Sequence, residues 1–139
     1  MERLEDSLND EDPIQILFAG TFPEMRKACD LLESLDCRGG FAVARTEYPD
    51  RDFTLIDVLH PACDKGAALA QRVRRRGIAA ENVMAIGDNW NDVTMLEFAG
   101  VPVIMGNSAE ELQQRGWYVT TTHDDAGVAQ AIKKFILPE

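Results

Sequence analysis

The stretch MAIGDNWND, residues 84–92, places an apolar run directly ahead of two carboxylates and two amides. The apolar run has the composition of a buried strand, and Asp88 stands at its carboxyl end. Asp92 follows about one helical turn later. The stretch therefore predicts a strand that delivers polar side chains to one edge of a sheet. The chemistry of those side chains depends on the residues around them.

The rest of this half alternates between helical and strand patterns. The expected strands cover residues 83–86, 101–105 and 117–120. The expected helices cover residues 64–77, 91–98, 108–114 and a C-terminal segment whose inward positions are Val128, Ile132 and Phe135. Such alternation is typical of a parallel sheet covered by helices, and these sheets bind ligands beyond the carboxyl ends of their strands.

The first half has a different organisation. Strands are expected over residues 14–20, 41–45 and 53–59, with a helix over 21–35 and a separating segment, TEYPD, at 46–50. The chain is thus predicted to be an α/β protein in three parts. These are an acidic flexible arm over residues 1–12, a small α+β domain over 13–60 and an α/β core over 61–139.

The composition excludes several classes of function. The 139 residues carry a formal net charge of -10, from 24 acids against 14 bases. Nucleic acids and anionic membrane surfaces require clustered Lys and Arg, so neither is an expected partner. No apolar run is long enough to cross a bilayer, and the acidic N-terminus does not resemble a signal peptide. The three cysteines lack metal-ligand spacing, which predicts reduced thiols and a cytoplasmic location.

The two acids of residues 84–92 admit three interpretations. A calcium loop of the EF-hand type fails, because its third, sixth and twelfth positions are Trp90, Val93 and Ala99. In a structural interpretation, the acids cap the following helix and favour its N-terminus. For one acid alone this interpretation is the simplest, but here several polar groups meet at the mouth of one strand.

The third interpretation is a magnesium site. Mg²⁺ prefers hard oxygen ligands and takes one or two carboxylates together with a substrate phosphate. Asp88 would ligate the ion directly, and Asp92 would bind through water or orient the ligands. Asn91 could donate a hydrogen bond to a phosphate oxygen. Unscreened like charges this close repel unless a cation or a proton intervenes, which favours this interpretation.

At these residues the chain resembles the haloacid dehalogenase superfamily, in particular its Cof-type sugar- and nucleotide-phosphate phosphatases. GDNWNDVTML, residues 87–96, resembles the superfamily's fourth motif, and DKGAAL, residues 64–69, resembles its third. GVPVIMGNS and DDAGVAQAI resemble the segments that close the core. Residues 14–59 look like the last part of the cap domain. The resemblance implies the C-terminal portion of such a phosphatase, with a Rossmann-like parallel core portion and a partial cap.

The resemblance also implies an activity and a set of site residues. The complete protein would be a Mg²⁺-dependent phosphoric-monoester hydrolase acting on small phosphorylated metabolites, such as sugar or nucleotide phosphates. Asp88 and Asp92 would hold the metal, Lys65 would contact the phosphoryl group, and Lys65 and Asn91 would bind the substrate. The alternative is a non-catalytic interaction or assembly module derived from the same fold.

The aspartate nucleophile of the superfamily lies in a D-x-D-x-T motif after an apolar strand. The chain has one literal match, Asp50, Asp52 and Thr54, but Pro49 ahead of it favours a turn and no crossover leads from it to the core. We interpret the match as a surface turn, with a catalytic Asp50 as the alternative, and expect the isolated chain to be inactive. A truncated core is further expected to form a homodimer or to bind a separate N-terminal piece.

Overall fold

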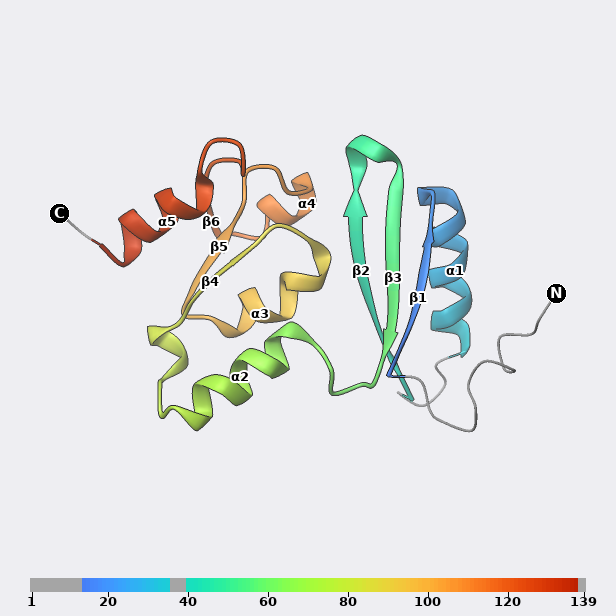
Figure 1. Cartoon of the computed structure of the whole chain (residues 1–139), viewed down its shortest axis with the longest axis horizontal. Coiled ribbons are helices and arrows are strands. Elements are labelled where there is room, and N and C mark those ends of the chain that lie inside the picture. Colours follow the sequence, from blue (N-terminus) through green and yellow to red (C-terminus); the bar gives the residue numbers. More distant parts are fainter. Residues whose placement is uncertain (1–13, 36–39, 138–139) are drawn as a thin grey trace.

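The computed structural model describes residues 14–35 and 40–137 and contains two sheets of three strands each (Figure 1). One sheet is antiparallel and belongs to a small lobe, and the other is parallel and belongs to a large lobe. This confirms the predicted α/β class. The expected acidic arm over residues 1–12 lies outside the described residues. Within the described ranges, no helix is both long and apolar enough to span a membrane.

The small lobe is built from the strands β1 (Gln15–Gly20), β2 (Ala42–Tyr48) and β3 (Phe53–Leu59) and the helix α1 (Phe22–Leu35). The strand order is β1-β3-β2, so β3 is central and β2 is the edge strand nearest the large lobe (Figure 1). Helix α1 packs against β3 and β1. Thr54 and Ile56 of β3 are almost fully buried. The small core of this lobe therefore lies along its central strand.

Strand β2 extends further than its sequence indicates. Residues 46–50 were expected to separate two strands, but the ladder with β3 continues to the pair Tyr48–Phe53. The two rings of that pair lie 6.0 Å apart between centroids. The chain then reverses through a short 3₁₀ helix, η2 (Pro49–Arg51), and through Asp52 in a left-handed conformation with φ 46°. Cross-strand packing of aromatic side chains stabilises this extension of the hairpin.

The large lobe alternates helices and strands as expected. Its elements are α2 (Lys65–Arg75), β4 (Met84–Gly87), α3 (Val93–Phe98), β5 (Val101–Ile104), α4 (Glu110–Gln113), β6 (Tyr118–Val119) and α5 (Gly127–Phe135). The strand order is β4-β5-β6 and both pairings are parallel. The buried core cluster joins the strands to α2, α3 and α4 and consists of Val73, Val83, Ala85, Leu96, Ala99, Ile104 and Leu112.

The prediction for the C-terminal helix was wrong for two of its three inward positions, since only Ile132 of the three is half-buried. Ala131 of α5 is fully buried, whereas Val128 is 48% exposed and Phe135 is 37% exposed. Phe135 packs edge-on against Tyr118, with ring centroids 5.1 Å apart. Gly127 allows the start of the helix to approach the backbone of Thr121, because a Cβ there would lie 2.1 Å from a carbonyl oxygen. This close approach turns the small residues inward and leaves part of the apolar face uncovered.

Asp64 is the N-cap of α2, and its charged carboxylate stabilises the first turn. The carboxylate accepts a hydrogen bond of 2.8 Å from the backbone N–H of Ala67. That bond, with smaller contributions from Thr94 and Gly66, outweighs desolvation and holds the pKa of Asp64 below its usual range. The helix that carries Lys65 is therefore fixed at its start by an ionised side chain.

We expect Asp64→Ala to lower the free energy of unfolding by about 1 kcal/mol, because the cap is lost. Asp64→Asn should retain most of the stability, since asparagine caps equally well. The pKa of Asp64 is lower in the folded state than in the unfolded state. The charge of Asp64 therefore stabilises the fold above the unfolded pKa of about 4, and this stabilisation is lost as the pH falls through the folded-state pKa. Denaturant unfolding at neutral and acidic pH measures this. If the difference in free energy of unfolding between wild type and Asp64→Asn did not become smaller in acid, the charge of Asp64 would have no role in stability.

Candidate active site

The candidate site lies at the carboxyl end of β4. Strand β4 ends at Gly87, where a Cβ would lie 2.5 Å from the Cβ of Asp92, so only glycine fits there without displacement. Asp88 follows and is exposed. Within residues 14–35 and 40–137, its carboxylate accepts no hydrogen bond and forms no ion pair. The strand thus delivers one unengaged carboxylate to the ligand edge of the parallel sheet.

Asp92 has a different role from Asp88, because its carboxylate is fully engaged. It is only 5% exposed. Its Oδ2 atom accepts hydrogen bonds from the backbone N–H groups of Asp88, at 3.0 Å, and of Asn89, at 3.2 Å. Its Oδ1 atom accepts a hydrogen bond from the Lys65 ammonium. Asp92 therefore fixes the path of the loop after β4 and ties it to helix α2.

Lys65 reaches the loop from the first turn of α2. Its side chain is 49% exposed, so the ammonium retains access to solvent while it pairs with Asp92. The N–H of Gly66 donates to the Thr94 hydroxyl at 3.1 Å, and a Cβ on Gly66 would lie 2.5 Å from the Thr94 carbonyl oxygen. The Lys-Gly pair thus combines a cation with the close helix contact that places it. A lysine at a helix N-terminus opposes the macrodipole, and its partner Asp92 offsets that cost.

The three residues between the acids turn toward the small lobe. The Asn89 side chain accepts from the Glu47 N–H at 2.9 Å and donates to the Glu47 carbonyl at 2.7 Å. The Trp90 indole N–H donates to the Glu47 carboxylate at 2.9 Å. The Asn91 amide donates to the Thr46 hydroxyl at 2.9 Å. The loop is therefore bound along the free edge of β2, the strand next to it (Figure 1).

Trp90 also takes part in a charged cluster with β2. The guanidinium of Arg45 lies over the Trp90 ring at 4.7 Å from its centroid and pairs with Glu47 at 3.2 Å. A charge-assisted contact of this kind is stronger than a neutral hydrogen bond, and the cation–π contact adds to it. The sequence pattern did not indicate Arg45 or Glu47 as functional residues, since their role depends on a contact between the lobes.

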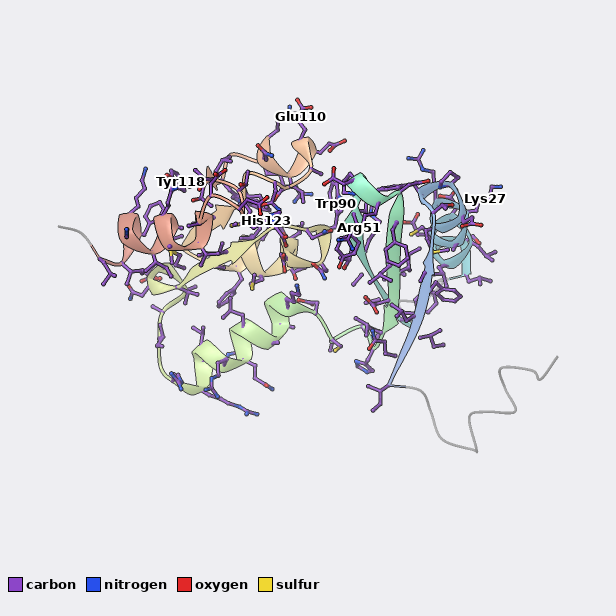
Figure 2. The ribbon with its side chains drawn as sticks, turned by 45° about the horizontal axis from the view of Figure 1, so that its top comes forward. Lys27, Arg51, Trp90, Glu110, Tyr118 and His123 are labelled. Atoms are coloured by element: carbon purple, nitrogen blue, oxygen red, sulfur yellow. The ribbon has the colours of Figure 1, made fainter. Side chains whose placement is uncertain are left out.

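Two clefts flank this contact. One, of about 410 Å³, is lined by the hairpin tip and by the loops after β4, β5 and β6, and contains Asp88, Asn107 and His123. Figure 2 shows Arg51 and Trp90 where the two lobes meet, with His123 on the large-lobe side. The other cleft, of about 420 Å³, lies between α1 and the large lobe and contains Asn91. The structure thus brings Lys65 and Asp92 together, places the backbone of Asp88 against Asp92, and turns Asn91 toward β2.

The literal D-x-D-x-T match lies in the turn of the antiparallel hairpin. Asp50 is exposed in η2, and the Asp52 carboxylate accepts a hydrogen bond of 3.1 Å from the Phe22 N–H. Thr54 is buried on β3 and its hydroxyl has no hydrogen-bond partner among the described residues. These residues do not end a parallel strand, although Asp50 lines the same cleft as Asp88.

The residues present fit a Mg²⁺ ion in part. Asp88 offers an unengaged hard oxygen ligand at the right edge of the sheet. Asp92 has already committed both oxygens to backbone N–H groups and Lys65. No group of three or more His, Cys, Asp or Glu side chains is arranged to hold a metal ion within the described ranges. One carboxylate fits a site that takes its remaining ligands from water and from a phosphate group.

The fold and this edge define an α/β protein whose small lobe packs beside the ligand end of a parallel sheet. A family model of haloacid dehalogenase-like hydrolases matches residues 2–132, and the chain belongs to that family. A haloacid dehalogenase-like hydrolase from Bacillus subtilis has a similar structure, with a TM-score of 0.74 at 26% identity. That match covers 96% of this chain and 45% of the other. The family resemblance of the motifs is thereby confirmed.

Two relatives with assigned names are phosphatases. The chain is 40% identical over 84 residues to a 5-amino-6-(5-phospho-D-ribitylamino)uracil phosphatase of Bacillus subtilis, which covers 60% of this chain and 34% of the relative. It is 38% identical over 81 residues to a phosphoglycolate phosphatase of Methanothermobacter thermautotrophicus, which covers 58% of this chain and 37% of the relative. The matches thus span about a third of these relatives and just under half of the solved structure.

Proposed function

We propose that this chain supplies the metal- and phosphate-binding part of a phosphomonoesterase. The observation that carries the proposal is the contrast between the two acids: Asp92 anchors the loop and Lys65, and Asp88 is left unengaged beside them. This division of roles gives a cation and a free carboxylate at one edge of a parallel sheet. Phosphoryl transfer depends on positioning and on neutralising charge, which these groups supply.

Each residue has a specific task in this proposal. Asp88 holds Mg²⁺, which when bound neutralises charge on the phosphate oxygens. Lys65 contacts the phosphoryl group, and Asp92 keeps the ammonium and the loop in place. Asn91 donates to a phosphate oxygen. The aspartate nucleophile is not among the residues that meet at the carboxyl end of β4 in the described ranges, so we propose that it belongs to sequence outside this chain.

The names of two relatives support a proposal for the substrate class. The named relatives act on a phosphorylated ribitylaminouracil and on phosphoglycolate, two small phosphomonoesters of unlike shape. We propose a small phosphorylated metabolite, such as a sugar or nucleotide phosphate, for the complete protein. The unpaired state of Cys29 and Cys63 supports a reducing, cytoplasmic location.

The isolated chain is expected to hydrolyse a generic phosphomonoester, such as p-nitrophenyl phosphate, no faster than a blank at millimolar Mg²⁺, because the proposal places the nucleophile on other sequence. Release of p-nitrophenol measures this. Turnover that disappears in Asp50→Ala would make Asp50 the nucleophile. Turnover that survives Asp50→Ala but not Asp88→Ala would indicate a metal-hydroxide mechanism instead. Supplying the N-terminal half of a close homologue should restore turnover that depends on Asp88 and Lys65.

A second candidate is an interaction module without catalysis. It is favoured by the uncovered apolar side chains of α5 and β6, which include Val119, Val128 and Phe135, and by the position of β4 at an edge of the parallel sheet. We propose a second copy of the chain, or a separate N-terminal piece, as the partner. A complex that forms but never hydrolyses phosphomonoesters would favour this function over the first.

A further inference from the structure

The loop between the two acids is held by β2 through bonds of unequal strength. Asn89 pairs with both backbone groups of Glu47, in the manner of a neighbouring strand. Trp90 donates to the charged carboxylate of Glu47. Asn91, in contrast, makes one neutral hydrogen bond, to the Thr46 hydroxyl. The Asn91 contact is therefore the one that is easiest to exchange, because Asn89 makes two bonds to Glu47 and the single bond of Trp90 is charge-assisted, whereas Asn91 makes one neutral bond.

The Asn91 contact involves a group that the proposed function needs. Asn91 lines the cleft on the α1 side, whereas Asp88 lines the other cleft, and neither cleft contains both residues. The two side chains thus face different spaces while Thr46 accepts from Asn91. A phosphate group held beside Asp88 and Lys65 would meet Asn91 only after that bond is broken.

We propose that the Thr46 hydroxyl masks Asn91 by holding its amide toward the cleft on the α1 side, so that the amide must leave Thr46 before it can meet a phosphate group beside Asp88. This inference rests on the proposed function, and it adds a regulatory contact from the small lobe to the same site. Asn89 and Trp90 keep the loop on β2 during the exchange, so the rearrangement is confined to the Asn91 side chain. A phosphate is a charged acceptor, and its bond to the amide is stronger than the one it replaces.

The masking contact has a measurable effect on affinity. When the competent state is only a fraction of the population, the apparent dissociation constant rises by the inverse of that fraction. One neutral hydrogen bond corresponds to about a twofold to tenfold change in such an equilibrium. Removing the Thr46 hydroxyl should therefore tighten phosphate binding by about that factor.

The test is a titration with inorganic phosphate in the presence of Mg²⁺, followed by the side-chain amide signals of Asn91 in two-dimensional NMR spectra. Thr46→Val matches the shape of threonine on a strand and removes the acceptor, so it should bind phosphate about twofold to tenfold more tightly. Thr46→Ser keeps the hydroxyl and should bind like wild type. Thr21→Val is the matched control: its hydroxyl bonds to Glu24 in the same lobe, away from the site, and its loss should leave the affinity unchanged.

The outcomes separate the masking contact from the proposed function. If Thr46→Val binds phosphate like wild type while Asn91→Ala weakens binding, the masking contact is wrong and the phosphate site stands. If neither wild type nor Thr46→Val binds phosphate at Asn91, the assignment of that residue in the proposed function fails and the masking contact with it. The far-ultraviolet spectrum and the unfolding curve of Thr46→Val show whether the lobes stay together. Tighter binding with native unfolding supports the proposal, and tighter binding only with altered unfolding overturns it, because the gain then comes from opened lobes.

Discussion

Replacing Asp92 with alanine is expected to lower the free energy of unfolding by about 2–4 kcal/mol, a large share of the stability of a small domain. The change leaves the N–H groups of Asp88 and Asn89 without their acceptor at the base of a tightly packed loop. It also removes the partner of Lys65, but this loss destabilises the protein less, because water can solvate the exposed ammonium. Denaturant unfolding at neutral pH measures the difference.

Asp88→Ala is the matched control for this prediction. It removes the same functional group four residues away, from a side chain that is exposed and makes no hydrogen bond or ion pair within the described ranges. Its effect on stability should stay within about 0.5 kcal/mol. Equal losses from the two variants would show that Asp92 does not anchor the loop, and the division of roles on which the proposed function rests would be lost.

The local patterns of the large lobe were sufficient to predict its fold. An apolar run predicted strand β4, and a polar helix start followed by Gly100 as a stop predicted the helix after it. The alternation of helices and strands predicted that β4 and β5 are parallel. The close approach of Gly87 to Asp92 is also a local effect. Within the site, the sequence predicted that Asp92 binds a metal through water or orients the ligands, and the structure gives its carboxylate three hydrogen-bond donors.

Long-range contacts could not be predicted in the same way. Asn89 and Trp90 bond to Glu47, more than forty residues earlier in the chain. No periodicity links these positions, because the bonds depend on how the edge of one sheet meets a loop of another. The exposure of Val128 and Phe135 has a similar origin. A helical pattern shows which side chains are apolar, but the neighbouring elements decide which of them are covered.

The large lobe has an unpaired strand edge and a group of exposed apolar side chains, and both features predict that the chain associates with a partner. Strand β4 lies at one edge of the parallel sheet, so one side of its backbone has no strand partner among the described residues. Unpaired edges recruit other strands. On the same lobe, a group of apolar side chains is more than a third exposed, namely Tyr118, Val119, Val128, Phe135, Ile136 and Leu137. Large apolar patches on proteins mark interfaces.

We expect the purified chain to self-associate, with closed two-fold dimers as the main product, because isologous pairing is the commonest way to cover an edge or patch. Sedimentation over a concentration series should show the mass rising from that of one chain toward that of two. Adding an N-terminal half of a related phosphatase should reverse the rise, since both partners compete for the same edge.

Two charge substitutions identify the surface that carries this association. Met84→Lys puts a charge on the edge strand β4 and should shift the equilibrium toward monomer, as lysine does on natural sheet edges. Val128→Lys puts the same charge on α5 and should leave the dimer intact if β4 is the contact. Dissociation by Val128→Lys alone would move the interface to the apolar face of α5. A wild-type chain that stays monomeric at high concentration and unfolds cooperatively would show that the sheet needs no partner at β4, and the proposal of a separate N-terminal piece would lose its structural basis.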